Sequence, residues 1–394
     1  MTTFHIEKCL SGIVILFCLQ CAGLFGGELS SQEPVYTSEA LMSLSLEELM
    51  EIEVIPHREA GGFAAQLQDE DAVAYVHFYG DSLYRDNDFN RGRDSKIFDM
   101  HYFNIMIGAN IEDRIIPEIL LEYEHGGDDI ALRYSMIDFV ILEPLVLRVG
   151  KFLVPMGKFN EYYTPEYLNK LSDRPYPLWK IVPLVWGEVG VQIRGDYELT
   201  KDQSINYAFY VVNGLEQSAN PDGTPGEGGD IRSMRNNFRD YNDDDKAYGG
   251  RIGFRPMKSF EVGLSYYNGA YTTDGERDLS IMNADIEFRR KALTLWGEYV
   301  KATQEVSSGD LNKDGFYAEA AYRVNRFVEP VYRFDQADLD DGGNTVQRST
   351  LGLTIYPTPG ISKYFQFKVN KSIIHDDGTG GTDGEFVVQC AFAF

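Results

Sequence analysis

Apolar and polar residues alternate in one short run after another over most of the chain. The final run is typical, since Phe386, Val388 and Cys390 are separated by single residues. Successive side chains of a β-strand point to opposite faces, so this alternation predicts strands with one apolar and one more polar face. About sixteen such runs can be counted. Their approximate cores are 72–84, 98–110, 115–124, 130–141, 145–153, 187–198, 205–213, 247–256, 260–270, 280–289, 293–303, 315–324, 327–337, 347–356, 362–373 and 385–394.

Short and long connections alternate between these runs. The segments 143–144 and 325–326 are tight turns. By contrast, the segments 215–246 and 375–384 are long, polar and rich in Asp and Gly. This alternation is typical of bacterial outer-membrane barrels, which have short periplasmic turns, long outer loops and an even number of strands. The sequence therefore predicts an all-β fold, a transmembrane antiparallel β-barrel of about 16 strands over residues 72–394.

The polar face of the predicted strands carries charge. In the run 280–289, Met282 and Ile286 share one face, whereas Asp285 and Glu287 share the other. Unpaired charge is costly in a packed core, but a water-filled lumen accommodates it. The charged faces are therefore expected to line a channel. The candidate pore-lining residues are Arg148, Arg194, Arg251, Asp285, Glu298, Glu319 and Arg333.

These charges divide along the chain. Arg148, Arg194 and Arg251 belong to earlier strands, whereas most of the acidic candidates belong to later ones. In a closed ring the two groups would lie on roughly opposite walls. Arg333 departs from this division and is placed to pair with Glu319 or Asp335. Two interpretations remain open, a transverse field that orients passing solutes and ordinary solvated charge.

One predicted loop is far longer than its neighbours and joins the runs 145–153 and 187–198. It is rich in aromatic residues and broken by proline. A compact domain rarely carries a loop of this length without a role, so we interpret it as the constriction loop of a pore, folded back into the barrel. Its aromatic residues either line a solute path or anchor the loop to the wall. Its candidate basic residues are Lys158, Lys170, Arg174 and Lys180.

The N-terminal part of the chain differs in kind from the rest. Lys8 precedes an apolar run and two glycines, which predicts a signal peptide over residues 1–27. Residues 28–71 are predicted to be a periplasmic leader with a short helix capped by Ser45. The mature chain would then keep one cysteine, Cys390, and no internal disulfide.

Several functional classes are not favoured. The formal net charge of −25 argues against nucleic-acid binding, which needs basic surfaces. No catalytic motif and no metal spacing is recognisable, so no enzyme activity, cofactor or metal is expected. The segment 310–315 matches the start of a calcium loop, but Ala321 stands where the closing Glu is needed. We therefore favour an acidic outer loop there.

Three segments together resemble the phosphate-selective porin O and P family. They are 148–157 (Arg-Val-Gly-Lys-Phe-Leu-Val-Pro-Met-Gly), 190–197 (Gly-Val-Gln-Ile-Arg-Gly-Asp-Tyr) and 207–214 (Tyr-Ala-Phe-Tyr-Val-Val-Asn-Gly). The resemblance implies a sixteen-stranded homotrimer in the outer membrane, and some such porins prefer anions through Arg and Lys along the pore. It also implies that the loop after the fifth strand narrows the channel. The outer loops of this chain are strongly acidic, which departs from a phosphate-selective porin.

The expected function is therefore that of a porin in the cell outer membrane, with a water-filled channel for passive diffusion of small hydrophilic solutes or ions. The resemblance adds anions such as phosphate, and the charges predict a weakly anion-preferring constriction behind an acidic outer mouth. The alternatives are a plugged or gated transporter of a specific solute, and a structural or adhesion barrel. Expected partners are outer-membrane lipid and lipopolysaccharide, the outer-membrane assembly machinery through the C-terminal strand, and further copies in a homotrimer.

Overall fold

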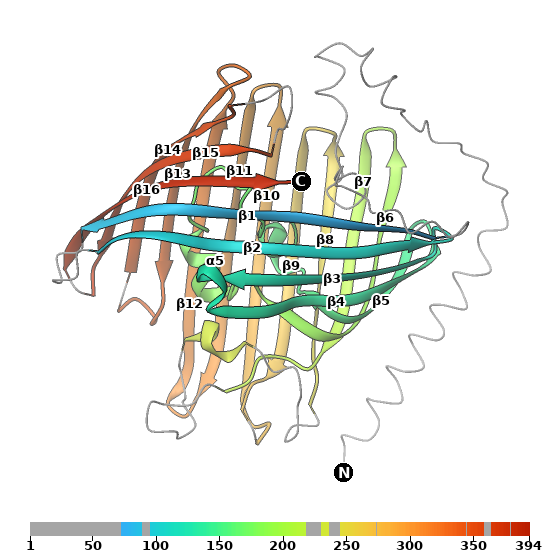
Figure 1. The fold of residues 1–394 in the computed structure, drawn as a ribbon. Coiled ribbons are helices and arrows are strands. Elements are labelled where there is room, and N and C mark those ends of the chain that lie inside the picture. The colour runs from blue at the N-terminus through green and yellow to red at the C-terminus, as the bar shows by residue number, and fades with distance from the viewer. Residues whose placement is uncertain are drawn as a thin grey trace. The chain divides into compact units, whose positions relative to one another are not determined.

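The computed structural model describes residues 72–88, 95–217, 230–235, 245–272, 274–343, 345–357, 364–378 and 380–394. Within them, sixteen antiparallel strands form one closed barrel (Figure 1). Each strand pairs with its neighbours in sequence, and β1 closes the ring against β16. The predicted fold class is confirmed. The predicted signal peptide, 1–27, and leader, 28–71, lie outside the described residues.

Long strands and short helical segments make up the described chain. The strands are β1 (Ala72–Asp88), β2 (Ser95–Ile111), β3 (Ile115–Glu124), β4 (Asp129–Leu142), β5 (Leu145–Leu153), β6 (Gly187–Thr200), β7 (Gln203–Val212), β8 (Ala247–Met257), β9 (Phe260–Ala270), β10 (Asp278–Arg290), β11 (Leu293–Val306), β12 (Gly309–Tyr322), β13 (Val328–Asp338), β14 (Thr345–Ile355), β15 (Gln366–Asp376) and β16 (Gly381–Ala393). The helical segments are η2 (His125–Gly127), α4 (Gly157–Tyr162), α5 (Tyr176–Ile181) and η3 (Ile231–Met234). None of these helices is long and apolar enough to cross a membrane.

One connection differs from the prediction. β11 and β12 form a long hairpin in which Thr303 lies opposite Asn312, and Lys301 lies opposite Asp314. Opposite charges and hydrogen-bonding pairs on facing strands stabilise a ladder, so the polar composition of this segment does not make it a loop. The interpretation of 310–315 as an acidic outer loop, or as the start of a calcium loop, is therefore wrong.

The first and last strands meet along a seam between β1 and β16. Tyr79 lies opposite Ala393, and the backbones of Phe78 and Phe394 exchange two hydrogen bonds of 2.8 and 2.9 Å. A closed ring is the arrangement that satisfies the backbone groups of strands in a lipid environment.

Side chains alternate between the two faces of the wall as predicted. On β16, the inward-facing Val387, Gln389 and Ala391 are almost completely buried. Leu264 of β9 and Leu351 of β14 face outward and are 68% and 65% exposed. An apolar outer surface around a polar interior is the pattern of a membrane barrel.

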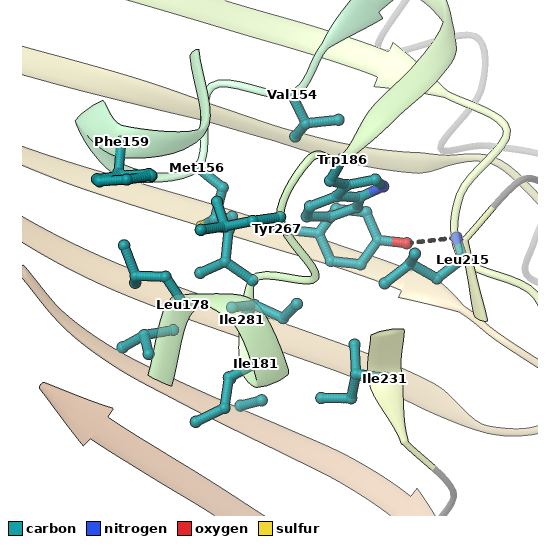
Figure 2. Packing of buried hydrophobic residues seen from close by; sticks show 14 of the residues in the cluster. Val154, Met156, Phe159, Leu178, Ile181, Trp186, Leu215, Ile231, Tyr267 and Ile281 are labelled. Carbon is teal, nitrogen blue, oxygen red and sulfur yellow. Dashed lines mark hydrogen bonds between the residues drawn. The ribbon is translucent and has the colours of Figure 1, made fainter. Parts of the chain in front are cut away.

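The main hydrophobic cluster lies inside the barrel. It forms where the loop between β5 and β6 packs against the inner face of β9 to β12 (Figure 2). Val154, Met156 and Trp186 of this loop are fully buried. The ring of Trp186 meets that of Tyr267 of β9 edge-on, with ring centroids 4.9 Å apart. Burial of these apolar side chains stabilises the loop in the lumen.

Candidate functional site

The loop between β5 and β6, residues 154–186, lies inside the barrel and is called the constriction loop from here on. Asn160 joins its two ends. The side-chain Nδ2 of Asn160 donates to the carbonyl oxygens of Val154 at 2.8 Å and Trp186 at 3.0 Å. Its Oδ1 accepts from the Trp186 backbone N–H at 2.9 Å. One buried amide therefore ties the entry of the loop to its exit.

The helix α4 fixes the first part of the constriction loop to the far wall. The Gly157 N–H donates to Ser265 Oγ of β9 at 3.0 Å, and the Phe159 N–H donates to Glu298 of β11 at 2.7 Å. Gly157 has a φ of 68°, and a Cβ atom there would overlap the Glu298 carboxylate. Only glycine meets both conditions, so this residue determines how closely the loop approaches the wall.

Two of the predicted basic loop residues bind carboxylates on the wall. Lys158 Nζ lies 2.9 Å from Glu261 of β9 and also contacts Glu287 of β10. Lys170 Nζ lies 3.0 Å from Glu329 of β13. These ammonium groups hold the loop in place, because each is paired with a buried carboxylate.

The carboxylate partners of the other two basic residues lie in loops rather than on the wall. Arg174 Nη2 donates to Glu166 of the same loop at 2.7 Å, and Arg174 Nη1 donates to the Tyr102 hydroxyl of β2 at 3.2 Å. Lys180 lies 3.5 Å from Asp230 in the β7–β8 connection. Burial raises the pKa of Glu166 to about 7, although the Arg174 guanidinium opposes this shift. Glu166 is therefore placed to change its charge near neutral pH.

Two predicted pore-lining arginines face inward and are paired. Arg148 of β5 donates to both carboxylate oxygens of Asp138 on β4, at 2.6 and 2.8 Å. Arg194 of β6 donates to Glu161 of the constriction loop at 2.5 Å. Each of these two guanidinium groups is therefore paired with a nearby carboxylate rather than with one on the opposite wall.

The expectation of opposite charged walls is wrong for Arg251. Arg251 donates to Asp285 through Nε at 2.9 Å and through Nη2 at 2.6 Å. Nη2 also donates to Glu261 at 3.1 Å. The side chain reaches from β8 across β9 to β10 over Gly263, where a Cβ atom would overlap both partners. Acidic and basic residues are thus interleaved around the lumen, and their fields largely cancel at short range.

The remaining predicted pore-lining residues also lie on the inner face. Glu298 accepts from Asn283 Nδ2 at 3.0 Å as well as from the loop backbone. Arg333 of β13 lies 3.5 Å from Glu319 and 3.0 Å from Asp335, so the expected pairing of Arg333 with these residues is confirmed.

Arg232 and Arg235, near η3, escaped the sequence analysis. Their guanidinium groups donate to the backbone carbonyl of Leu184 in the constriction loop, with Arg235 Nη1 at 3.1 Å. The Arg232 guanidinium carbon lies 3.1 Å from the ring centroid of Trp179. Burial, together with neighbouring arginines, lowers the pKa of Arg232 to about 9 and that of Arg235 to about 10. The one sequence signal for this pair is that two arginines lie three residues apart within a long acidic connection.

Comparison with known proteins places the chain in a family. The model of the Gram-negative porin family matches residues 147–367, more than half of the chain. The chain belongs to the Gram-negative porin family. The matched region contains the constriction loop and the strands that it contacts from β6 to β14. Membership of the narrower phosphate-selective family is not established by this match.

Solved structures with the same fold cover 82–84% of this porin. An anion-selective porin from Comamonas acidovorans has a TM-score of 0.60 at 12% identity, over 82% of this chain and 100% of that one. The outer-membrane channel DcaP of Acinetobacter baumannii has a TM-score of 0.56 at 9% identity, over 84% and 100%. A trimer form of OmpT from Vibrio cholerae has a TM-score of 0.53 at 9% identity, over 82% and 100%.

A sequence relative of this porin occurs in Aquifex aeolicus. It is an uncharacterized protein, 26% identical over 363 residues, with 81% of this chain and 80% of the relative covered. The family, the closed barrel and its apolar outer surface place this porin in the outer membrane. The family and the fold are those of channels rather than enzymes.

Proposed function

We propose that this protein is a passive porin whose channel admits small hydrophilic solutes and prefers anions. Sixteen strands enclose an interior wide enough for an aqueous channel. The constriction loop lies across that interior, where its position decides which solutes pass. The solved structure of an anion-selective porin with the same fold supports the choice of anions.

The observation that carries the anion preference is the pair Arg232 and Arg235. Among the described residues, no carboxylate lies within ion-pairing distance of either guanidinium, in contrast to the arginines of the barrel wall. Nη2 of each side chain likewise has no acceptor in the described ranges. A guanidinium presents forked N–H donors that match the oxygens of carboxylate and phosphate groups. Two such groups at the outer side of the constriction loop favour an oxyanion over a cation.

Phosphate is the first anion to test, because of the resemblance of segments 148–157 and 190–197 to phosphate-selective porins. Purified protein in planar bilayers should conduct both chloride and phosphate, with the reversal potential in a salt gradient on the anion side. Conduction of chloride with no conduction of phosphate would keep the anion preference and refute phosphate as a solute. A reversal potential on the cation side in both salts would refute the anion preference.

A gated transporter is the second candidate, and the constriction loop favours it. Side chains on β9, β11, β13, β14 and β15 bond to the loop, the last through Lys368, which donates to the carbonyl oxygen of Glu166. A loop fixed at so many points leaves a narrow passage. Steady conductance in the absence of any added solute would decide for the passive porin, and its absence for the gated transporter.

The proposed assembly is a homotrimer. The trimer form of OmpT has the same fold and supports this assembly. Mass measurement of the protein in mild detergent tests it, and a species with the mass of three chains is expected. A single-chain mass under conditions that preserve the folded barrel would refute it.

A further inference from the structure

Four consecutive residues of the constriction loop, 173–176, are clamped by charged side chains of the wall. Arg333 Nη1 of β13 donates to the Asp173 carbonyl at 2.8 Å, and Arg348 Nη2 of β14 donates to the Arg174 carbonyl at 2.6 Å. The Tyr176 N–H donates to Asp335 Oδ1 of β13 at 2.9 Å. The backbone of this segment is therefore held directly by ionised groups.

The side chain of Asp173 extends the clamp to the seam between the first and last strands. Arg85 of β1 donates to Asp173 Oδ1 through Nη2 at 2.9 Å. Through Nη1 the same guanidinium contacts Glu385 of β16. Arg85 thus bridges a loop carboxyl group and a wall carboxyl group, which brings Asp173 and Glu385 together on the two nitrogens of one guanidinium.

The charges around this clamp do not balance. The basic groups are Arg85, Arg333 and Arg348, and the acidic groups are Asp173, Glu319, Asp335 and Glu385. Apart from Arg85, at 22% side-chain exposure, and Asp173, at 13%, all of them are less than a tenth exposed. An excess carboxylate is unfavourable in a buried site, so one of the four acidic groups is expected to hold a proton.

Glu319 and Glu385 are the two acidic groups left to hold a proton, and Glu385 is the one that lies beside the loop carboxyl group of Asp173. Asp335 accepts from Arg333, Arg348 and the loop backbone. Burial alone would raise the pKa of Asp173, but the guanidinium groups of Arg85 and Arg348 outweigh it and hold the pKa well below its ordinary value. Glu385 has one guanidinium within ion-pairing distance, that of Arg85, which it shares with Asp173, and Arg348 lies farther away.

The residues directly opposite Glu385 on the neighbouring strands add no positive charge. Asn87 of β1 and Ser372 of β15 lie opposite it in the two neighbouring strands, and neither is ionisable. Asp383, two residues away on the same inner face of β16, adds negative charge. When the Asp173–Glu385 pair loses its proton, two adjacent carboxylates share the Arg85 guanidinium, and the Asp383 carboxylate lies nearby. The three negative charges repel one another.

We propose that Asp173 and Glu385 form a proton-dependent latch that holds the constriction loop against the seam of the barrel. With one shared proton the loop is docked and the passage is narrow. Loss of this proton at alkaline pH makes the two carboxylates repel, the segment 173–176 leaves the wall, and the passage widens. The proposal rests on the proposed channel function, because it assigns to that channel a means of regulation.

Single-channel recording of the full-length protein between about pH 6 and pH 9 tests the latch. Release of one proton shifts the ratio of wide to narrow states by up to about tenfold per pH unit. The Glu385→Gln variant keeps a hydrogen-bonding amide that cannot ionise, so its ratio should stay at the narrow limit throughout. Glu118→Gln is the matched control, because Glu118 is an inner-face carboxylate bound to Tyr75 of β1, apart from the latch. It should behave as the unchanged protein.

A second measurement does not depend on conduction. In a Cys390→Ser background, a Ser172→Cys substitution places a thiol in the buried loop next to Asp173. The rate of thiol labelling is measured in this protein and in the same protein with Glu385→Gln added. Dividing the first rate by the second cancels the pH dependence of the thiol itself. This ratio of rates should rise by up to about tenfold per pH unit.

The outcomes separate the latch from the channel. A conducting protein whose state ratio is independent of pH, or a Glu385→Gln variant with the pH dependence of the unchanged protein, would overturn the latch alone. An absence of conductance with a pH-dependent labelling ratio would overturn the channel function and keep the latch. If Glu385→Gln fails to fold, Asp173→Asn removes the same carboxylate pair and should also abolish the pH dependence.

Discussion

Arg251 donates two hydrogen bonds to Asp285, across the strand that separates them. Both side chains are almost completely buried, at 3% and 2% exposure. The pair closes over Gly263 of β9, so the wall itself is shaped to let one charge reach the other. Arg251 therefore neutralises a neighbouring wall charge and supports the constriction loop indirectly.

Replacing Arg251 should destabilise the barrel more than it alters selectivity. The Arg251→Gln change leaves Asp285 and Glu261 buried beside each other without their shared cation, which typically costs about 3–5 kcal/mol. The urea midpoint of the folded protein in detergent, followed by the heat-dependent gel shift of the barrel, measures this loss. Arg255→Gln is the control, because Arg255 is more exposed and also binds Glu261. An equal effect of the two changes would contradict the structural role of Arg251.

The amide of Asn160 should determine how firmly the constriction loop is closed. Asn160→Ala leaves the buried Trp186 N–H without its acceptor, at a cost of about 1–3 kcal/mol. It also removes one donor from each of the Val154 and Trp186 carbonyl oxygens, which keep their backbone donors. Single-channel records should then show larger current fluctuations, together with a lower unfolding midpoint. The Asn160→Asp change keeps the acceptor for the Trp186 N–H but turns a buried carboxylate oxygen toward two carbonyl oxygens, so a loss at least as large as that of the alanine variant is expected. Unchanged current noise in the alanine variant would show that the loop is held elsewhere.

Arg232 and Arg235 should determine the sign of selectivity. Changing both to Gln removes about 1 kcal/mol of attraction for an anion at the constriction, a loss of about fivefold in the anion-to-cation permeability ratio. The reversal potential in a potassium chloride gradient reads this ratio directly. Arg148→Gln serves as the comparison, because Arg148 is already paired with Asp138. If the reversal potential shifts in Arg148→Gln and not in the double variant, Arg232 and Arg235 do not determine the selectivity.

Glu166 should make the folded protein less stable toward unfolding as the pH rises. Burial raises the pKa of Glu166 from 4.5 to about 7. A carboxyl group with a raised pKa in the folded state contributes stability that is fully present below about pH 4.5 and is lost as the pH rises through about 7. Unfolding midpoints measured from pH 4 to pH 8 should therefore fall less in Glu166→Gln than in the unchanged protein. Parallel curves would mean that Glu166 does not titrate in this range.

Much of the fold follows from local pattern. Period-two alternation located the strands, because each strand of a barrel wall separates lipid from lumen, and turn length distinguished the two ends of the barrel. The interior position of the constriction loop followed from its length. The pairing of Arg333 with Glu319 was also accessible, because these residues face each other on neighbouring strands.

The site was less accessible because its contacts cross the lumen. Arg251 reaches Asp285 only in the register that places Gly263 between them, and no short-range pattern fixes that register. Arg232 and Arg235 bind backbone carbonyls of another loop, which have no sequence signature. The hairpin at 310–315 was mistaken for a loop because its Asp and Lys residues resemble loop composition, whereas their cross-strand pairing decides the structure.

The central claim, an anion-preferring porin, is tested most directly by the reversal potential of the unchanged protein across a planar bilayer at low and high ionic strength. The Debye length falls from about 10 Å at 0.1 M salt to about 3 Å at 1 M, so high salt screens the acidic outer loops more than charges in contact with the solute. We expect steady conductance and a mild anion preference that grows as the salt concentration rises. Strong cation selectivity at both salt concentrations would contradict it.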